Sequence, residues 1–315
     1  MPYVIPLLTG MLLVLILIPL IRRYALRIGF VDRPGGRKIH ASPVPLLGGV
    51  AIYIGVTVSV LLYAGWSAQT KTILIGGTAL MTIGLLDDSF KTRGKEFPVW
   101  PRLIVYLAAA VVPLLFGIEI SGIRGLHGMI AFPTAVAWLG TILWMFAIPN
   151  MINFIDGVDG LASGIITIAS AALFFAALWQ RQPESAILAA ILFGVCLGFL
   201  AYNFYPARIF MGDSGAVFLG YTIAVLAVNG SFKSATVISL FVPILALGVP
   251  IFDTAQVFMR RLLRGSGLHH ADNLHTHHVL MRWGLSQTQT VAFLYLIEIA
   301  FTLLAVILLL LYPAL

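Results

Sequence analysis

The sequence predicts an all-α, polytopic integral membrane protein with about ten transmembrane helices and both termini outside the cell. Two observations carry this prediction: the hydropathy of the chain and the distribution of its cations. Of the 315 residues, 60% are hydrophobic and 10% are charged, and the mean hydropathy is +1.01. A soluble fold of this length cannot bury so many apolar side chains, so the chain needs a bilayer around it.

Apolar runs of about 17 to 25 residues, the length that crosses a bilayer as a helix, recur along the whole chain. They lie near 3–21, 44–65, 70–86, 102–118, 132–149, 161–179, 185–201, 214–231, 235–258 and 291–312. We therefore expect residues 1–315 to form a single transmembrane domain. The lone cysteine, Cys196, lies inside an apolar run, which excludes a disulfide framework and a cysteine-based metal site.

The cations give the orientation of these spans. Fifteen of the 19 Lys and Arg residues lie in the connections that follow the odd-numbered spans, and positive charge stays in the cytoplasm. An even number of spans then places both termini outside. Aspartates gather on the same cytoplasmic side, although acids contribute little to orientation; they are Asp32, Asp87, Asp88, Asp156, Asp159, Asp213 and Asp272, with Asp253 near the inner end of the ninth span. This clustering predicts a functional site at the cytoplasmic face.

The centre of the predicted site is the stretch 150–164, which joins two long apolar runs. Polar side chains recur there at every third position: Asn150, Asn153, Asp156 and Asp159. A spacing of three keeps neighbouring members on roughly one face of a helix, so two amides and two carboxylates can converge on one ligand. The alternative is a plain polar loop between membrane helices, but this stretch contains no cation.

Two further groups of acids lie at the ends of predicted spans. Asp87 and Asp88 are adjacent, and their repulsion needs a divalent metal, a raised pKa, or pairing with Lys91 or Arg93. Asp213 is followed by Ser214 and Gly215, an arrangement that can place a carboxylate and backbone amides on a metal-bound phosphate. The competing role for Asp213 or Ser214 is to cap the eighth predicted helix.

Two basic segments complete the predicted site. Lys38 and His40 lie in a loop rich in Pro and Gly whose amides can hold phosphate, unless the loop is only a basic flank of the membrane. His275, His277 and His278 form a cluster that can bind zinc. Because no cysteine accompanies them and the acids elsewhere suit magnesium, we expect these histidines to hydrogen-bond to substrate or phosphate.

Acids, amides and histidines on one face of a lipid-soluble bundle suit transfer between a magnesium-chelated phosphate donor and an acceptor in the bilayer. Two other classes of membrane protein fit the sequence less well. The phosphotransferases that use CDP-alcohols carry an Arg after the Ala of their Asp-Gly motif, and the stretch 156–163 has none. A transporter would carry acids near the bilayer midplane and two similar halves, neither of which is evident.

Several motifs together give a resemblance to a known family. In order they read Arg37-Lys-Ile-His, Gly84-Leu-Leu-Asp-Asp, Asn150-x-x-Asn-x-x-Asp-Gly-x-Asp-Gly-Leu-Ala, Asn203 with Phe210-Met-Gly-Asp-Ser-Gly, Pro250-Ile-Phe-Asp-Thr, and His275-x-His-His followed by Gly284-Leu-Ser-x-x-Gln. From about Asp32 to Val291 the chain resembles the bacterial polyprenyl-phosphate N-acetylhexosamine-1-phosphate transferases of the glycosyltransferase 4 type. Within them it is more similar to the enzymes that use N-acetylglucosamine than to the muramoyl-pentapeptide branch.

The resemblance implies a UDP-N-acetylhexosamine donor, most simply UDP-N-acetylglucosamine, and undecaprenyl phosphate as acceptor in the cytoplasmic membrane of a bacterium. It implies Mg²⁺, with Mn²⁺ as a substitute, and the products UMP and a lipid-pyrophosphate-linked sugar that begins a cell-envelope glycan. A UDP-MurNAc-pentapeptide or another UDP-N-acetylated sugar is the alternative donor. The bilayer is a partner, a homodimer is compatible with the family, and nucleic acid is not expected.

By this likeness Asp213 is a metal ligand beside the catalytic pair Asp87 and Asp88. The expected substrate-binding residues are Lys38, His40, Asn150, Asn153, Asp156, Asp159, Asn203, Phe210, His275, His277 and His278, and Asp156 is also a candidate metal ligand. Two mechanisms stay open: Asp87 acts as a base in a direct attack, or an acid of the pair acts as a nucleophile. Two positions depart from the family pattern, Lys91 after the acid pair and Asn273 before the histidines.

Overall fold

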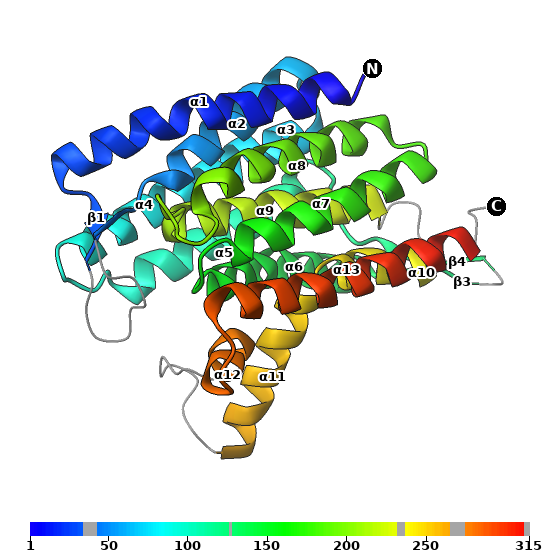
Figure 1. The fold of residues 1–315 in the computed structure, drawn as a ribbon. Helices are drawn as coiled ribbons and strands as arrows, with labels where there is room; N and C mark the ends of the chain where they lie inside the picture. The colour runs from blue at the N-terminus through cyan, green and yellow to red at the C-terminus, as the bar shows by residue number, and fades with distance from the viewer. Residues whose placement is uncertain (34–42, 126–127, 232–236, 265–274, 312–315) are drawn as a thin grey trace.

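The computed structural model describes residues 1–33, 43–125, 128–231, 237–264 and 275–311, so the candidate residues Lys38 and His40 lie outside the described residues. Long helices lie side by side in one bundle, and two helices project from it at one end (Figure 1). The helices are α1 (Val4–Ile28), α2 (Gly48–Tyr63), α3 (Ala68–Thr72), α4 (Thr78–Thr92), α5 (Val99–Leu115), α6 (Thr134–Ile155), α7 (Leu161–Trp179), α8 (Pro183–Asn203), α9 (Gly212–Ser231), α10 (Val237–Ala246), α11 (Gly248–Arg264), α12 (Thr276–Arg282) and α13 (Gln287–Leu311). A π-helix, η1 (Ile73–Gly77), joins α3 to α4 without a break.

The bundle confirms a polytopic membrane protein. Within the described residues, seven helical stretches are long and apolar enough to cross a membrane, and α2 and α5 are shorter apolar helices. The predicted ninth span, 235–258, is wrong as a single helix because α10 ends at Ala246 and α11 begins at Gly248. Pro250 lacks a backbone donor and its ring opposes a continuous helix, which accounts for a break here. Figure 1 shows α11 directed away from the bundle.

A buried acidic residue of α13 stabilises the break between α10 and α11. Glu298, on α13, is fully buried, and its Oε2 accepts a hydrogen bond of 2.8 Å from the backbone nitrogen of Val249. That nitrogen belongs to the first turn of α11 and has no partner within its own helix. Glu298 therefore fixes the base of α11.

We expect Glu298→Ala to destabilise the protein, because the Val249 amide would stay buried without an acceptor, at a cost of about 1–3 kcal/mol. Glu298→Gln keeps an acceptor oxygen and serves as the matched control. Thermal unfolding in detergent micelles should show a lower midpoint for the alanine variant and a nearly unchanged midpoint for the glutamine variant. Equal midpoints for both variants would show that the hydrogen bond contributes little.

The helix α9 forms the centre of the bundle and packs against α2, α4, α6 and α7. Its first turns lie very close to two neighbours. A Cβ atom added to Gly49 of α2 would lie 2.5 Å from the nitrogen of Gly215, and one added to Gly84 of α4 would lie 2.5 Å from the Cα of Ser214. Small residues allow such approach of membrane helices. The N-terminus of α9 is thereby held between α2 and α4.

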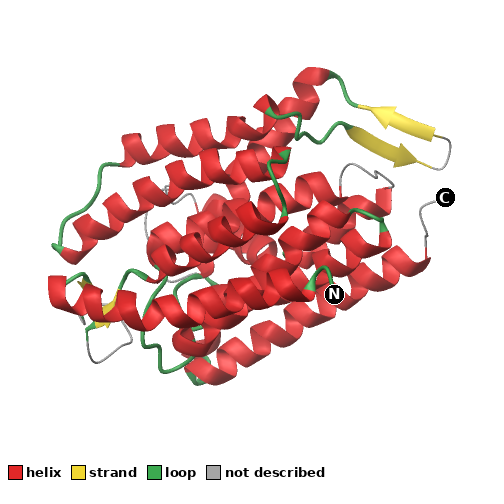
Figure 2. Cartoon of the chain, turned by 90° about the horizontal axis from the view of Figure 1, so that it is seen from above, coloured by secondary structure: helices red, strands yellow, loops and turns green. Residues whose placement is uncertain are grey.

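Two short antiparallel ladders modify the all-α prediction. They are formed by β1 (Val31–Asp32) with β2 (Val44–Pro45), and by β3 (Gly122–Gly125) with β4 (Gly128–Ala131). Figure 2 places them at opposite ends of the bundle. Each lets a connecting segment pair its backbone polar groups. The carbonyl of Pro45 also accepts a hydrogen bond of 2.8 Å from the nitrogen of Phe210, which joins β2 to the segment before α9.

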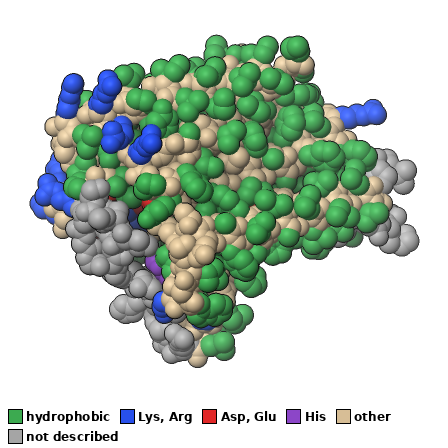
Figure 3. Space-filling view, viewed as in Figure 1, with side chains coloured by type: hydrophobic (Ala, Val, Ile, Leu, Met, Phe, Trp, Pro, Cys, Tyr) green, Lys and Arg blue, Asp and Glu red, His purple; other side chains and the backbone are tan. Residues whose placement is uncertain are grey.

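Charge is distributed unevenly over the surface. Figure 3 shows most of the visible Lys and Arg side chains at the end of the bundle where β1 lies, and hydrophobic side chains over the long flank. Asp, Glu and His side chains are visible in a hollow near the same end (Figure 3). The start of α1 and the end of α13 lie at the other end (Figure 1). The acids and most of the visible cations thus share one end, as the sequence predicts.

Candidate active site

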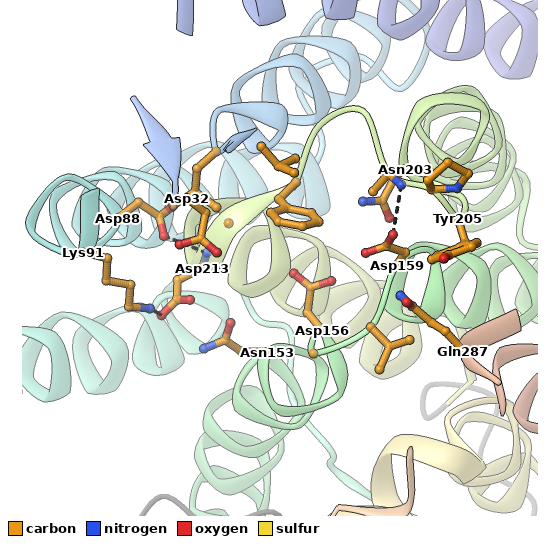
Figure 4. Close-up of a pocket in the computed structure, with 18 of the residues that line it drawn as sticks. Asp32, Asp88, Lys91, Asn153, Asp156, Asp159, Asn203, Tyr205, Asp213 and Gln287 are labelled. Carbon is orange, nitrogen blue, oxygen red and sulfur yellow. Dashed lines mark hydrogen bonds and ion pairs between the residues drawn. The ribbon is translucent and has the colours of Figure 1, made fainter. Parts of the chain in front are cut away.

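A cavity of about 770 Å³ opens at this charged end of the bundle. Its wall combines residues from α4, α6 and α9 with the segments that follow α6 and α8. Figure 4 shows Asp88, Lys91 and Asp213 on one side, Asn203, Tyr205 and Gln287 on the other, and Asp156 between them. The cavity therefore contains acids, a cation and neutral amides within reach of one ligand.

Asp213 and Asp87 both pair with Lys91. The Lys91 Nζ lies 2.6 Å from the Asp213 Oδ2 and 3.4 Å from the Asp87 Oδ2. The Arg102 Nη1, on α5, lies 3.0 Å from the same Asp87 oxygen. Asp87 is 2% exposed, and the residues that form the cavity wall do not include it. The structure therefore shows the pairing with Lys91 that the sequence offers as an alternative, and Arg102 is a second cationic partner of Asp87.

Asp88 has a different environment from its neighbour. Its carboxylate accepts three hydrogen bonds from the start of α9: from the Asp213 nitrogen (3.0 Å), the Ser214 nitrogen (3.1 Å) and the Ser214 Oγ (2.8 Å). Gly212 has φ of +71°, and a Cβ there would collide with this carboxylate. Asp88 therefore caps the N-terminus of α9, so the alternative in which Asp213 or Ser214 caps this helix is not what the structure shows.

Asp156 lies just after α6 and points into the cavity (Figure 4). Burial, followed by the charges of Asp213, Asp88 and Asp159, raises the pKa of Asp156 well above its ordinary value. Asn153 lies on the same side, one helical turn earlier, near Asp213 (Figure 4). Negative side chains thus gather without enough positive charge at Asp156, which favours a bound cation.

The other members of the evenly spaced series have separate positions. Asn150 donates a hydrogen bond of 2.6 Å to the carbonyl of Phe146 in its own helix and is not part of the cavity wall. Asp159 lines the cavity, and its Oδ2 accepts from the Ala207 nitrogen at 2.9 Å. The series diverges because α6 ends at Ile155 and the chain turns. Three of the four predicted side chains therefore reach the cavity.

Asn203 and Phe210 also line the cavity, as predicted. The Asn203 amide is engaged within the protein: its Nδ2 donates to the Ile209 carbonyl at 3.0 Å, and its Oδ1 accepts from the Gly160 nitrogen at 3.2 Å and the Ser163 Oγ at 3.1 Å. These bonds join the end of α8 to the start of α7 and to the segment that precedes α9. In this arrangement Asn203 shapes the wall of the cavity more than it offers a free amide to a ligand.

The three histidines lie beside α11. The His275 Nδ1 lies 2.7 Å from the Asp253 Oδ2, which ties the start of α12 to α11. His277 is 2% exposed and stacks on His275 at 5.8 Å between ring centroids. Burial, and then the charge of His278, lower the pKa of His277 to about 3, so this ring is neutral at pH 7. Only His278 of the three lines the cavity.

Asp32, one of the clustered aspartates, lines the cavity, whereas Lys95, Tyr205 and Gln287 are wall residues that sequence reasoning missed. One signal was available for Gln287. The Ser286 Oγ accepts from the Gln289 nitrogen at 3.2 Å, and the Gln289 Oε1 accepts from the Ser286 nitrogen at 2.8 Å. This reciprocal pair is a capping box, which the Ser-x-x-Gln sequence encodes. It starts α13 and so places Gln287 at the cavity.

The donor set of the cavity suits magnesium better than zinc. Within the described residues no group of three or more His, Cys, Asp or Glu side chains is arranged to hold a metal ion of any kind. Magnesium usually takes one or two carboxylates and completes its coordination with water and substrate phosphates. Asp213 and Asp156, with the oxygen of Asn153, provide such a partial set.

These features define a class of protein: a multi-pass membrane protein with a cavity of acids, a cation and amides at one end of an apolar bundle. Residues 71–231 match the model of glycosyl transferase family 4, about half of the chain. The chain belongs to this family and is a membrane-bound polyprenyl-phosphate sugar-1-phosphate transferase. The transporter alternative is thereby excluded.

Curated relatives match almost the whole chain. A probable undecaprenyl-phosphate N-acetylglucosaminyl 1-phosphate transferase of Bacillus subtilis is 37% identical over 97% of this chain and 84% of its own length. A decaprenyl-phosphate N-acetylglucosaminephosphotransferase of Mycobacterium tuberculosis is 30% identical over 88% and 75%. A phospho-N-acetylmuramoyl-pentapeptide-transferase of Moorella thermoacetica is 33% identical over 93% and 98%. The relatives are bacterial enzymes with different named donors.

Proposed function

We propose that the protein transfers N-acetylglucosamine-1-phosphate from UDP-N-acetylglucosamine to undecaprenyl phosphate, which releases UMP and forms the lipid-pyrophosphate-linked sugar. The observation that carries this proposal is the cavity in which Asp213, Asp156 and Lys91 meet at the polar end of an apolar bundle. Acids and a cation there suit a metal-bound diphosphate, and the surrounding helices suit a lipid acceptor. The 37% identical Bacillus relative, named for this reaction, supports the choice of sugar and lipid.

We place the cavity at the cytoplasmic face of a bacterial inner membrane, with both termini outside and residues 1–315 acting as one catalytic domain. The support is the excess of Lys and Arg in the connections at the cavity end, because positive charge stays in the cytoplasm. A nucleotide sugar is also made and held on that side of the membrane, in contact with water. The acceptor phosphate would lie at the same surface, within the inner leaflet.

Asp213 and Asp156 are the residues that would hold Mg²⁺, with Asn153 beside them. When bound, the ion would neutralise the charge of the donor diphosphate and of the departing UMP. Lys91, which lies 2.6 Å from Asp213, can then turn its ammonium group toward a phosphate oxygen. These assignments derive from the shared wall of the cavity and from the chemistry of carboxylate ligands.

The reaction is a displacement at the β-phosphorus of the donor. An oxygen of the lipid phosphate forms the new bond to this phosphorus, and the bond to the oxygen that bridges to the α-phosphate breaks, so UMP leaves with the electron pair. A phosphate monoester has a second pKa of about 6 and is mostly dianionic at neutral pH, so it needs little help from a base. Asp87, bound to Lys91 and Arg102, suits positioning of those cations. Asp88, with three hydrogen bonds, is a weak candidate for a nucleophile.

A panel of donors tests the proposed function. Purified protein with undecaprenyl phosphate should convert UDP-N-acetylglucosamine into a lipid-extractable product and UMP. It should convert UDP-N-acetylgalactosamine and UDP-MurNAc-pentapeptide at least about tenfold more slowly, because even one methylene group in a binding pocket is discriminated by about 1–3 kcal/mol. Preference for the pentapeptide donor would instead assign the muramoyl reaction, for which the 33% identical Moorella relative is named.

Removal of divalent metal should abolish the same reaction. We expect EDTA to reduce turnover to background, because the carboxylates of Asp156 and Asp213 would repel the donor diphosphate without a cation between them. Mg²⁺ should restore turnover fully and Mn²⁺ in part, whereas Ca²⁺ and Zn²⁺ serve as controls for other coordination preferences. Full turnover in EDTA would contradict the metal assignment while leaving the choice of donor intact.

A further inference from the structure

The turn between α6 and α7, residues 156–160, carries two acids of the cavity. Asp156 follows the last residue of α6, Asp159 lies three residues later, and Gly160 precedes the first residue of α7. Gly160 has φ of +79°, a left-handed conformation that glycine adopts about as readily as others. Such a residue does not fix the turn by itself. The position of the two carboxylates therefore depends on contacts from other segments.

Three side chains and backbone groups from outside hold this turn. The Asp159 Oδ2 accepts from the Ala207 nitrogen at 2.9 Å, and the Gly160 nitrogen donates to the Asn203 Oδ1 at 3.2 Å. The third contact comes from α13, where the Tyr295 hydroxyl donates to the Gly160 carbonyl at 2.5 Å. The two peptide groups that flank Gly160 are thus held by side chains of α8 and α13.

The start of α7 is shaped to admit the Tyr295 ring. A Cβ atom added to Gly164, one helical turn after Gly160, would collide with the Tyr295 hydroxyl and ring. Glycine inside a helix is less stable than alanine, so the space that it leaves for Tyr295 accounts for its presence. Small residues at a spacing of four also let membrane helices approach closely. In agreement, α13 packs along α7 (Figure 1).

Tyr295 acts on the cavity through the backbone of the turn. It is not part of the cavity wall, whereas Asp156 and Asp159 are. Gln287, eight residues earlier on α13 and about 12 Å along the helix axis, does line the cavity. The helix α13 therefore meets the site at two levels, once at the wall and once beneath the turn.

We infer that Tyr295 is a positioning residue, which holds the turn 156–160 through the Gly160 carbonyl and so presents Asp156 and Asp159 to the cavity. The effect on transfer rests on the proposed function, in which these acids lie beside the donor diphosphate and its metal. The effect on the turn rests on geometry alone. A looser turn lowers the fraction of molecules that have both carboxylates in place, and reaction rates depend steeply on such placement.

Hydrogen exchange in the absence of substrate and metal tests the hold of Tyr295 on the turn. Tyr295→Phe removes the hydroxyl and keeps the ring. The Gly160 carbonyl retains its helical donor, the Gly164 nitrogen at 2.9 Å, so the protein should still fold. Amides in the peptide 154–162 should exchange about fivefold faster, because one tether of the turn is lost. Exchange of this peptide at the wild-type rate would overturn the inference.

The transfer assay tests the consequence for the reaction. Tyr295→Phe should lower kcat about tenfold and raise the Mg²⁺ concentration for half-maximal rate about fivefold, because both proposed donor-side acids lie on the turn. The KM for undecaprenyl phosphate should change less than about twofold, since the substitution does not act on the acceptor. An unchanged kcat with an unchanged Mg²⁺ dependence would show that Tyr295 does not position the acids.

Tyr221→Phe is the matched control, because it makes the same chemical change at another bond from a tyrosine to the backbone. The Tyr221 hydroxyl donates to the Ala109 carbonyl at 2.9 Å and so joins α9 to α5. Pro113, four residues after Ala109, has no backbone donor to replace it. This variant should lower the unfolding midpoint at least as much as Tyr295→Phe, with normal exchange of the turn and normal Mg²⁺ dependence. Equal kinetic losses in both variants would reduce Tyr295 to a general contribution to stability.

A second variant moves the hydroxyl without removing it. In Gly164→Ala the new methyl group would displace the Tyr295 ring, so the kinetic changes should resemble those of Tyr295→Phe. The double variant should be little worse than either single one, because both break the same contact. Gly140→Ala, on α6 where an added Cβ meets no atom within 4 Å, controls for the substitution itself. Fully additive effects would overturn the inference.

Failure of this inference is distinct from failure of the proposed function. If the wild-type protein transfers no sugar phosphate to undecaprenyl phosphate, the proposed function is wrong, and hydrogen exchange still decides whether Tyr295 holds the turn. If the wild type is active and Tyr295→Phe behaves as the Tyr221→Phe control does, only the role of Tyr295 is wrong.

Discussion

Asp213→Asn should reduce turnover by about a thousandfold with little change in folding, because the neutral amide removes the charge that would hold the metal beside the donor diphosphate. The backbone of Asp213 would keep its place, since Asp88 accepts the hydrogen bond of its nitrogen. The measurement is steady-state UMP release at saturating donor and acceptor, with thermal unfolding recorded on the same samples. Residual activity should need a far higher Mg²⁺ concentration than the wild type.

The matched control for this variant is Glu184→Gln, the same chemical change in the first turn of α8, at an exposed position. It should have normal turnover and the same Mg²⁺ dependence as the wild type. An Asp213→Asn protein that is folded, active and unchanged in its metal dependence would remove Asp213 from the metal site. Asp156 and Asn153 would then have to be reconsidered as the main ligands.

Asp88→Ala should unfold the site rather than alter only its chemistry. The substitution leaves three donors at the start of α9 without an acceptor in a buried place, and each such group costs about 1–3 kcal/mol. We therefore expect a loss of several kcal/mol in stability and a clearly lower unfolding midpoint in detergent. Turnover should be lost as well, since Asp213 lies on the turn that would be released.

Ser89→Ala provides the comparison, because Ser89 is the half-buried neighbour of Asp88 and its hydroxyl donates to the Leu86 carbonyl in its own helix. Its free energy of unfolding should stay within about 0.5 kcal/mol of the wild-type value. If Asp88→Ala unfolds at the wild-type temperature but is inactive, Asp88 acts in the chemistry and its role as a cap is secondary. If it is both stable and active, the assignment as a cap is wrong.

Most of the membrane helices could be predicted from hydropathy, because burial in lipid requires long apolar runs. The break between α10 and α11 was missed for the same reason: the residues on both sides are apolar, so a hydropathy window does not separate them. The local signal was the pair Gly248 and Pro250. The partner that stabilises the break, Glu298, comes from a helix 49 residues away, which no local pattern indicates.

The site shows the same division between what is local and what is not. The spacing of Asn153, Asp156 and Asp159 predicted that they line one cavity, because neighbouring residues of such a series share a face. The roles of Asp87 and Asp88 could not be separated from sequence, because two adjacent residues look equivalent there. Asp88 acquires its role from α9, 125 residues later.

The position of Glu298 links the interior of the bilayer to the rim of the cavity. It holds Val249 at the base of α11, and Asp253, about 6 Å further along the axis, holds His275 and hence α12. A tilt of α11 by about 10° about its base would move this contact by about 1 Å, enough to change catalysis where geometry is demanding. A change at Glu298, inside the bundle, would therefore be transmitted through α11 to His275 beside the cavity.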